Sequence, residues 1–485
     1  MKVRPTLIAL AAACALGGCS LAPVYKVPVV DVPDSYKEAG PWQPAAPSDQ
    51  GERGDWWRDY GDATLDDLES RVDTANPDLA AALDRYAQAR AYSAETRAGL
   101  FPQVDAAAGA TRNRQSDHRP LRSASQPDEY RDNLIGAQLG YEFDLWGRVR
   151  NLVAAGEATA QASAADLASV RLSLHAELAN DYIALRGLDA QAKLLDDTVT
   201  AYARALALTQ NRFRGGAASG LDVARAHTQL DNARAQSTDV QARRALLEHA
   251  IATLVGAPAS KFTLPAQVVE ISEPAIPTGI PSTLLERRPD VAAAERRTAA
   301  ANANVGIARA AFFPSITLTA IGGFENTGGA DWLSAPNSFW SIGPRAFLTL
   351  FDAGRREARV DQARAALDEA GERYRATALA AFQQVEDNLA LIHLLGEEAK
   401  SQDAAAASAQ RTLNLALDRY RNGAVSYLEV VESQTAELQA QRASLSLRDR
   451  ELQASVGLIR ALGGGWVPGE AAGTSPSSAV AASNW

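Results

Sequence analysis

Residues 212–223 read RFRGGAASGLDV, and residues 419–430 read RYRNGAVSYLEV. The two stretches lie 207 positions apart, and shorter signatures recur at nearly the same spacing: Phe101-Pro102 returns as Phe313-Pro314, and Phe143-Asp144 returns as Phe351-Asp352. Landmarks that recur in the same order at nearly one spacing indicate an internal duplication. Residues 76–256 and 288–463 are therefore expected to form two copies of one structural unit.

The first residues have the pattern of an export signal. Lys2 and Arg4 precede an apolar run over residues 7–16, which is too short to remain as a membrane-spanning helix. Small residues then lead to Cys19, which resembles a bacterial lipobox and implies cleavage before Cys19, with covalent diacylglycerol and N-acyl chains on that cysteine. An ordinary export signal that happens to contain Cys19 is the alternative. By resemblance to lipoprotein sorting rules, Ser20 rather than Asp after the cysteine favours the outer membrane over the inner membrane.

The composition excludes several classes of function. The formal net charge of -10 at pH 7 argues against a nucleic-acid partner, because an acidic chain repels phosphate. Cys14 lies in the predicted signal peptide, so no disulfide is expected. The five histidines lack metal-ligand spacing, and the sequence has neither a phosphate-binding loop nor a nucleophile elbow. We therefore expect no enzyme activity and no cofactor besides the lipid chains.

Proline placement divides the chain. There is no proline between Pro127 and Pro258 or between Pro344 and Pro468, and both stretches are rich in Ala, Leu, Arg, Gln and Glu, so each can hold very long helices. The expected organisation is a signal peptide (1–18), a lipid-anchored tether (19–55), a first repeat (56–270), a second repeat (271–467) and a flexible C-terminal tail (468–485).

Each long helical stretch has coiled-coil periodicity. Apolar residues from Leu185 to Phe213 follow a 3-4 alternation, interrupted by Thr209, and the second copy repeats this alternation from Leu428 to Ile459. An unbroken helix from residue 148 to residue 213 would measure ~100 Å at 1.5 Å per residue, so we expect an elongated molecule.

The tip of each expected hairpin carries helix-ending and helix-starting residues. Each has a glycine that can adopt the left-handed conformation, a serine that can cap the next helix, and an acid three residues later that can complete a capping box. These are Gly216, Ser219 and Asp222 in the first copy and Gly423, Ser426 and Glu429 in the second. Each copy is therefore expected to be a helix pair folded back on itself.

Alternating sequence before each long helix predicts two strands per copy. The predicted strands are Val104–Ala110, Asn133–Phe143, Ser315–Ile321 and Trp340–Leu350, with loops over 112–131 and 322–338. No stretch after the signal peptide approaches the ~20 apolar residues of a transmembrane helix, so any membrane crossing must be made by strands. Four strands cannot close a barrel, and closure would have to come from other subunits. A soluble hairpin packed on helices is the alternative.

Taken together, these features resemble the TolC-like outer membrane efflux duct family, in its OprM/NodT-type lipoprotein branch. The matching landmarks run through nearly the whole mature chain: Cys19, Trp56-Trp57, Phe101-Pro102, 143–148, 284–290, Phe313-Pro314-Ser315, 351–355 and 420–432. The resemblance implies a mainly α fold with a transmembrane β portion. Duplicated α-hairpins would form a trimeric periplasmic α-barrel, and four strands per protomer would complete a 12-stranded outer membrane β-barrel.

The same resemblance implies partners and a gate. The expected partners are two further protomers, a periplasmic adaptor, an inner-membrane RND-type transporter and outer membrane lipid. The expected periplasmic gate is Leu428, Glu429 and Glu432, supported by Asp222, Arg225, Arg419 and Tyr420. Three copies of one carboxylate around an axis attract cations, so a closed tip is expected to prefer cations and to respond to pH. For Glu429 a capping role is an equally good explanation.

Two other functions fit parts of the sequence. A periplasmic adaptor lipoprotein is also exported and built on long helical hairpins, but it has one hairpin in a lipoyl-like β-module rather than two in tandem. An outer duct for a protein-secretion ABC system is the other alternative. The sequence does not identify the exported substrate, the pump or the gate diameter.

Overall fold

The structure is a computed structural model that describes residues 20–38, 54–118, 123, 125, 127–274, 276, 287–328 and 331–464. The predicted signal peptide, the lipid attachment at Cys19 and the C-terminal tail lie outside the described residues. None of the described helices is both long enough and apolar enough to cross a membrane.

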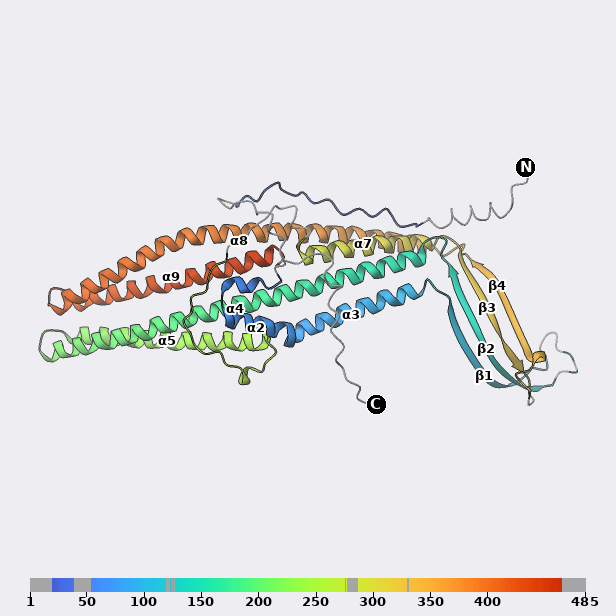
Figure 1. Cartoon of the computed structure of the whole chain (residues 1–485), viewed down its shortest axis with the longest axis horizontal. Coiled ribbons are helices and arrows are strands. Elements are labelled where there is room, and N and C mark those ends of the chain that lie inside the picture. Colours follow the sequence, from blue (N-terminus) through green and yellow to red (C-terminus); the bar gives the residue numbers. More distant parts are fainter. Residues whose placement is uncertain are drawn as a thin grey trace. The chain divides into compact units, whose positions relative to one another are not determined.

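The two copies fold into the same order of elements (Figure 1). The first copy contains α3 (Pro77–Ala98), β1 (Gln103–Arg114), β2 (Glu129–Phe143), α4 (Arg148–Arg214) and α5 (Gly220–Leu254). The second contains α7 (Pro289–Ala310), β3 (Ser315–Asn326), β4 (Ser338–Phe347), α8 (Arg355–Arg421) and α9 (Tyr427–Ala461). The other described elements are η2 (Trp56–Tyr60), α2 (Ala63–Ala75), η3 (Ala259–Lys261) and η4 (Ala335–Asn337). Corresponding helices have equal lengths of 22, 67 and 35 residues, so the duplication in sequence is a duplication of structure.

The chain divides into two compact units. One comprises Met1–Val29, Arg85–Ser163 and Ala293–Arg375 and contains the β-sheet. The other comprises Val30–Asp84, Ala164–Ala292 and Ala376–Trp485 and contains both hairpin tips, with α5, α9 and the greater part of α4 and α8.

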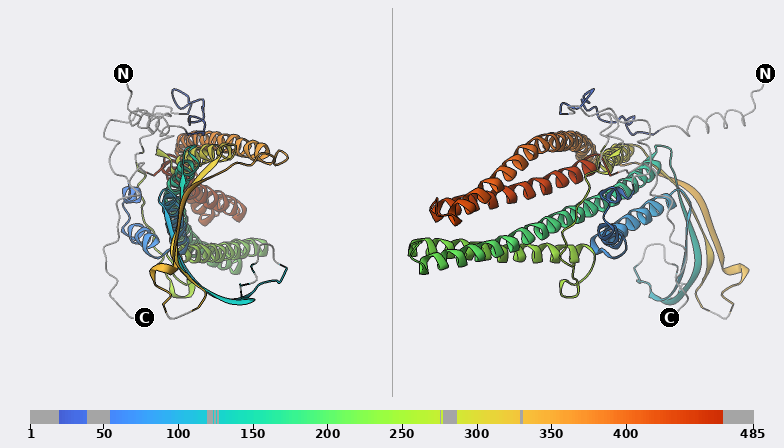
Figure 2. Two further views of the ribbon diagram at one scale, coloured as in Figure 1. Left: turned by 90° about the vertical axis from the view of Figure 1, so that its right-hand side faces the viewer. Right: turned by 60° about the vertical axis from the view of Figure 1, so that its left-hand side comes forward.

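The sheet joins strands from both copies. Its order is β1-β2-β3-β4, and every neighbouring pair is antiparallel. The long strands curve together (Figure 2). At the junction of the copies Gly136 lies opposite Gly323. A Cβ on Gly323 would lie 2.3 Å from the carbonyl oxygen of Ile135, so glycine permits this close approach of two backbones.

The strand ends differ from those predicted. β1 continues to Arg114 and β2 begins at Glu129, inside the predicted loop 112–131. β3 continues to Asn326, inside the predicted loop 322–338, whereas β4 ends at Phe347. The reason is that an antiparallel ladder is held by backbone hydrogen bonds, which continue through polar residues and glycines where the side-chain alternation fades.

In the unit with the sheet, the N-terminal segment is held through its backbone. Asn302 Nδ2 donates to the carbonyl oxygen of Pro23 at 2.9 Å, and Arg309 Nη1 donates to that of Leu21 at 3.3 Å. Residues 20–29 therefore follow a defined path in this unit. In the same unit Trp146 stacks on Phe313 at 4.7 Å and donates to the carbonyl oxygen of Pro314.

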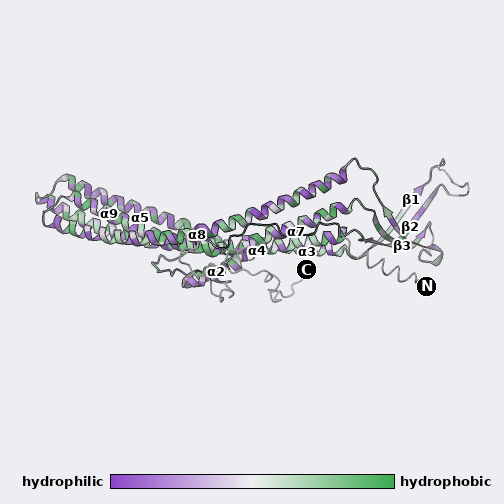
Figure 3. Cartoon of the chain, turned by 90° about the horizontal axis from the view of Figure 1, so that it is seen from above, coloured by the Kyte–Doolittle hydropathy of each residue, from purple (hydrophilic) through white to green (hydrophobic). Residues whose placement is uncertain are grey.

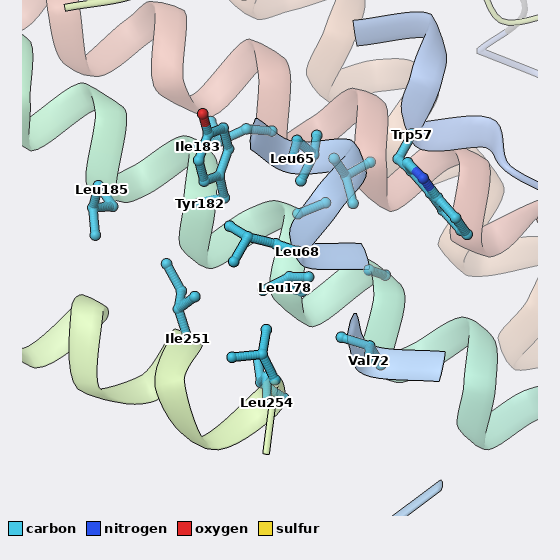
Figure 4. Close-up of a cluster of buried hydrophobic side chains, with 14 of the residues drawn as sticks. Trp57, Leu65, Leu68, Val72, Leu178, Tyr182, Ile183, Leu185, Ile251 and Leu254 are labelled. Carbon is cyan, nitrogen blue, oxygen red and sulfur yellow. The ribbon is translucent and has the colours of Figure 1, made fainter. Parts of the chain in front are cut away.

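The largest hydrophobic core belongs to the unit with the hairpins (Figure 4). It gathers side chains from η2, α2, α4, α5 and α9. Trp56 and Trp57 are 4% and 3% exposed, so this pair packs into the core. Tyr182 and Leu178 of α4 are fully buried there.

The helical hairpins pack along one face of each helix. Hydrophobic and hydrophilic residues alternate along the helices (Figure 3), as expected where one side is packed and the other is exposed. Leu185 and Leu195 on the predicted seam of α4 are fully buried. Phe213 also belongs to the predicted seam but is 50% exposed, because α4 reaches the tip there and its facing partners end.

Candidate functional site

Both hairpin tips close through the same backbone geometry. Gly216 and Gly423 have φ of 74° and 77°, the left-handed region that L side chains rarely adopt. The Ala217 amide donates to the carbonyl oxygen of Arg212, and the Ala424 amide donates to that of Arg419, both at 2.8 Å. These bonds end α4 and α8 with a left-handed glycine, as the sequence predicts.

The caps of the next helices differ between the copies. In the first copy Ser219 Oγ accepts from the Asp222 amide at 3.2 Å, and Asp222 Oδ2 accepts from the Ser219 amide at 3.0 Å, which is a complete capping box. In the second copy Ser426 makes no side-chain cap hydrogen bond, so the predicted capping box with Glu429 is wrong. The Glu429 carboxylate lies 3.7 Å from Arg419 Nη1 instead, because this longer side chain pairs across the turn.

One arginine joins the two tips. Arg212 Nη1, at the end of α4, donates to the carbonyl oxygens of Tyr420 at 2.7 Å and of Arg421 at 3.1 Å, at the end of α8. Its guanidinium also lies 4.7 Å from the centre of the Tyr420 ring. A cation at a helix C-terminus is favourable because the last carbonyl groups have no partner within the helix. Arg212 therefore caps a helix of the other hairpin.

Tyr420 makes the second link between the hairpins. Its hydroxyl donates to Thr209 Oγ1 of α4 at 3.3 Å, and its ring lies 5.3 Å from the ring of Tyr427. Tyr427 is 1% exposed, and burial, reinforced by the nearby Tyr420 and Asp222, raises its pKa to about 12. Both tyrosines belong to a hydrophobic cluster to which α4, α5, α8 and α9 all contribute.

The other predicted supporting residues act within one hairpin. Asp222 lies 3.7 Å from Arg225 on α5 in addition to capping that helix, and Arg419 pairs with Glu429 of its own hairpin. Sequence reasoning missed Arg212 as a functional residue. Its counterpart in the repeat is Arg419, and this correspondence was the one available signal.

The predicted gate residues lie on the exposed side of α9. Leu428 is 40% exposed, and Glu429 and Glu432 are also exposed. Leu428 and Glu432 are four residues apart and share one helix face. Tyr427 and Val430 are buried on the opposite face. The tip thus presents Leu428 and Glu432 on an exposed face, beside Glu429, whose carboxylate pairs with Arg419.

A groove of ~680 Å³, lined by both polar and apolar side chains, runs between α5 and α9. Gln229 Nε2 donates to Thr435 Oγ1 at 2.9 Å, and Arg442 Nη1 donates to Gln236 Oε1 at 2.8 Å, so hydrogen bonds bridge the two helices along it. Arg225 also lines the groove. Polar contacts of this kind hold two helices less tightly than an apolar seam does.

Metal ligands are not gathered in the described part of the chain. No three His, Cys, Asp or Glu side chains there are placed to hold a metal ion.

Comparison with known proteins gives one consistent result. The model of the family described as "Outer membrane efflux protein" matches residues 70–257 and 280–464. The chain is 33% identical to the pyoverdine export outer membrane protein OpmQ of Pseudomonas aeruginosa, over 95% of this chain and 97% of that protein. It is 33% identical to outer membrane protein OprJ of the same organism, over 95% and 96%. The solved structure of the CmeC outer membrane channel of Campylobacter jejuni superimposes with a TM-score of 0.88 at 26% identity, covering 93% of this chain and 96% of that one.

Proposed function

This chain belongs to the outer membrane efflux protein family and is an outer membrane efflux channel that extends into the periplasm, and we propose that it works as a homotrimer gated by the tip of α9. Its relatives are channel and transport proteins. The family match covers both copies, which does not fit an adaptor with one hairpin, and relatives named for export or efflux of small molecules favour efflux over protein secretion.

The sheet supports the homotrimer. β1 and β4 each pair with one described strand, so each has an edge whose backbone groups lack partners within the protomer. An open edge is not tolerated in hydrocarbon, where an unpaired amide or carbonyl group costs several kcal/mol. Pairing β1 of one protomer with β4 of the next would satisfy both edges, and three protomers would close a sheet of twelve strands.

The exposed face of α9 supports the gate. Leu428 and Glu432 would form successive rings around a threefold axis, with Glu429 contributing further negative charge. Rings of carboxylates favour cations over anions. The contacts of Arg212 and Tyr420 hold the two hairpins together at the tip, so they favour the closed arrangement. Opening would separate the hairpins and requires a partner that binds the open form more tightly.

The other components of an efflux pump would include the partner that binds the open form. A periplasmic adaptor and an inner-membrane RND-type transporter would complete the export path, and the duct would conduct passively. OpmQ is named for pyoverdine export and other relatives for toluene or antibiotic efflux. Small molecules are accordingly the substrate class proposed here, with the choice among them made by the transporter. Diacylglycerol and an N-acyl chain on Cys19 would anchor the N-terminus in the outer membrane.

The observation that carries the gate is the exposure of Leu428 and Glu432 on one face of α9, opposite the buried Tyr427 and Val430. The test is single-channel recording of the purified protein in planar bilayers. Glu432→Ala should reduce the preference for cations. Asp418→Ala is the matched control, because it removes an exposed carboxylate from α8 of the same hairpin, where Asp418 pairs with Arg421 of its own helix, and it should change the preference less. An unchanged cation preference in Glu432→Ala would remove this residue from the gate.

A further inference from the structure

A buried ionic cluster lies in the unit with the hairpins, away from the tips. His175 of α4 is 2% exposed and lies between two carboxylates of α2. Its Nδ1 is 2.6 Å from Glu69 Oε2, and its Nε2 is 3.1 Å from Asp73 Oδ1. Arg171, one turn earlier on α4, donates two hydrogen bonds to Asp73 at 2.7 and 2.8 Å. We call Glu69, Asp73, Arg171 and His175 the His175 clasp.

The clasp needs a proton. Both imidazole nitrogens face carboxylate oxygens, and an imidazole can donate at both positions only when it is protonated. The alternative is a proton on Glu69 that is donated to a neutral ring. Either way, one proton is shared by His175 and Glu69. If it leaves, a lone pair on the ring faces a carboxylate lone pair, and one bond between the helices is replaced by repulsion.

Other charged side chains and one aromatic ring surround His175 and its partners. α2 also carries Asp66, whose charge acts on Glu69. Asp55, just before η2, acts on Arg171 and pairs with Arg58. The ring of Trp57 from η2 stacks on the imidazole at 4.4 Å and 20°. Glu69 Oε1 is buried and has no hydrogen-bond partner among the described residues.

The corresponding positions of the repeat carry apolar residues instead of charges. α4 and α8 have the same length, and the positions of α8 that correspond to Arg171 and His175 are Ala378 and Phe382. Both are buried, at 0% and 8% exposure. A buried ion group carries a desolvation cost that apolar residues avoid, and replacing such groups by apolar residues is often stabilising. The first copy therefore holds a costly arrangement where the second copy packs apolar side chains.

We propose that the His175 clasp is a proton-dependent lock, which holds α2 firmly against α4 while His175 and Glu69 share a proton and loosens this contact when that proton is lost. The clasp joins α2 to α4 in the first repeat. It does not involve the predicted gate residues Leu428, Glu429 and Glu432.

The directions of the pKa shifts agree with this lock. Burial lowers the pKa of His175, but its hydrogen bonds to Asp73 and Glu69 and their charges outweigh that effect and raise it. Burial raises the pKa of Glu69 to about 7, against the opposing effect of His175. Burial also acts to raise the pKa of Asp73, but its hydrogen bonds to His175 and Arg171 prevail and lower it to about 2.

The sign of the pH dependence follows from these shifts. The folded state holds the shared proton more tightly than the unfolded chain, in which histidine has a pKa of ~6.5, so this stabilisation is present below about pH 6.5 and is lost as pH rises through the raised pKa of His175. Asp73 contributes stability above its unfolded pKa of ~3.9, which is lost only as pH falls towards 2. The clasp is therefore strongest between about pH 4 and pH 6.5.

The test is hydrogen exchange of the full-length lipoprotein in detergent, read by mass spectrometry at pH 6 and pH 8.5 and corrected for the intrinsic effect of pH on exchange. Peptides from α2 should lose at least about tenfold in protection at the higher pH, while peptides from residues 376–395 of α8 should not. Glu69→Gln is the matched variant, because its amide can donate to a neutral imidazole. In this variant the decrease in the protection of α2 between pH 6 and pH 8.5 should be at most half of that in the wild type.

Two results would overturn the lock. One is α2 protection in the wild type that changes no more than that of α8. The other is a Glu69→Gln protein that keeps the full pH dependence of the wild type. Should Glu69→Gln fail to fold, the comparison of α2 with α8 in the wild type still decides.

Discussion

Arg212 shows how much one side chain contributes at the hairpin tips. Its guanidinium donates to two carbonyl oxygens at the end of α8 and lies over the ring of Tyr420. A hydrogen bond from a charged donor contributes about 1.5–3 kcal/mol, and partial exposure reduces this value. If the closed arrangement loses ~1.4 kcal/mol of stability relative to the open one, the equilibrium between the two shifts tenfold towards the open arrangement.

Arg212→Ala is therefore expected to raise the open probability in single-channel recordings about tenfold. Arg212→Lys should have an intermediate effect, because an ammonium keeps the charge but not the planar donor geometry. Arg214→Ala is the matched control, since Arg214 contacts Asn211 of its own helix. Equal open probabilities for the Arg212 and Arg214 variants would contradict a role for Arg212 as a clamp between the hairpins.

Residues that act locally could be predicted from the sequence, and residues that act across long separations could not. The left-handed glycines at 216 and 423 follow from helix-ending patterns within a few residues. Arg212 finds its acceptors more than 200 positions away, and His175 finds Glu69 at a separation of 106. No local pattern encodes such distances. In the sequence His175 is simply one of five scattered histidines.

At the scale of elements, the two copies provide a matched comparison of helix caps. Ser219 and Asp222 form a complete capping box at the start of α5, whereas Ser426 at the start of α9 makes no side-chain cap hydrogen bond. Replacing a capping serine by alanine costs about 1 kcal/mol.

Ser219→Ala should therefore increase hydrogen exchange in the first turn of α5 about fivefold, since 1 kcal/mol corresponds to that factor. Ser426→Ala should change the first turn of α9 less than about twofold, because no cap bond is lost. Mass spectrometry of peptides from both tips measures the two effects together. Equal increases at α5 and α9 would contradict the difference between the caps.

Helix spans were predictable and strand ends were not. The helix expected to run from residue 148 to residue 213 is α4, Arg148–Arg214, because a proline-free stretch with a sustained period leaves few alternatives. Strand ends depend on which backbone pairs with which, and β3 continues through Gly322 and Gly323 because β2 of the other copy lies beside it. Which strand lies beside β3 depends on the tertiary fold rather than on the residues of β3 alone.

At the scale of the whole molecule, the duplication leaves a sheet that a single chain does not complete. The two copies contribute two strands each, β2 and β3 join them, and β1 and β4 remain as edges. The sequence predicted the number of strands and the need for other subunits, because four strands are too few to close. It could not predict the pairing register, since register is set by backbone contacts between segments ~180 residues apart.

Cysteine cross-linking tests the trimer directly. The mature chain is expected to retain Cys19 alone, with its sulfur in the lipid linkage, so introduced cysteines would be the only free thiols. A chain with Ala108→Cys in β1 and a second cysteine in β4, at Ile342, Gly343 or Arg345 in turn, should form covalent trimers on oxidation for the pair that lies in register. Denaturing electrophoresis separates trimers, dimers and monomers. Each single variant is the control, because one cysteine per chain cannot link three chains. If every double variant stays monomeric after oxidation, β1 and β4 do not meet between protomers, and the closed sheet on which the proposed duct depends is excluded.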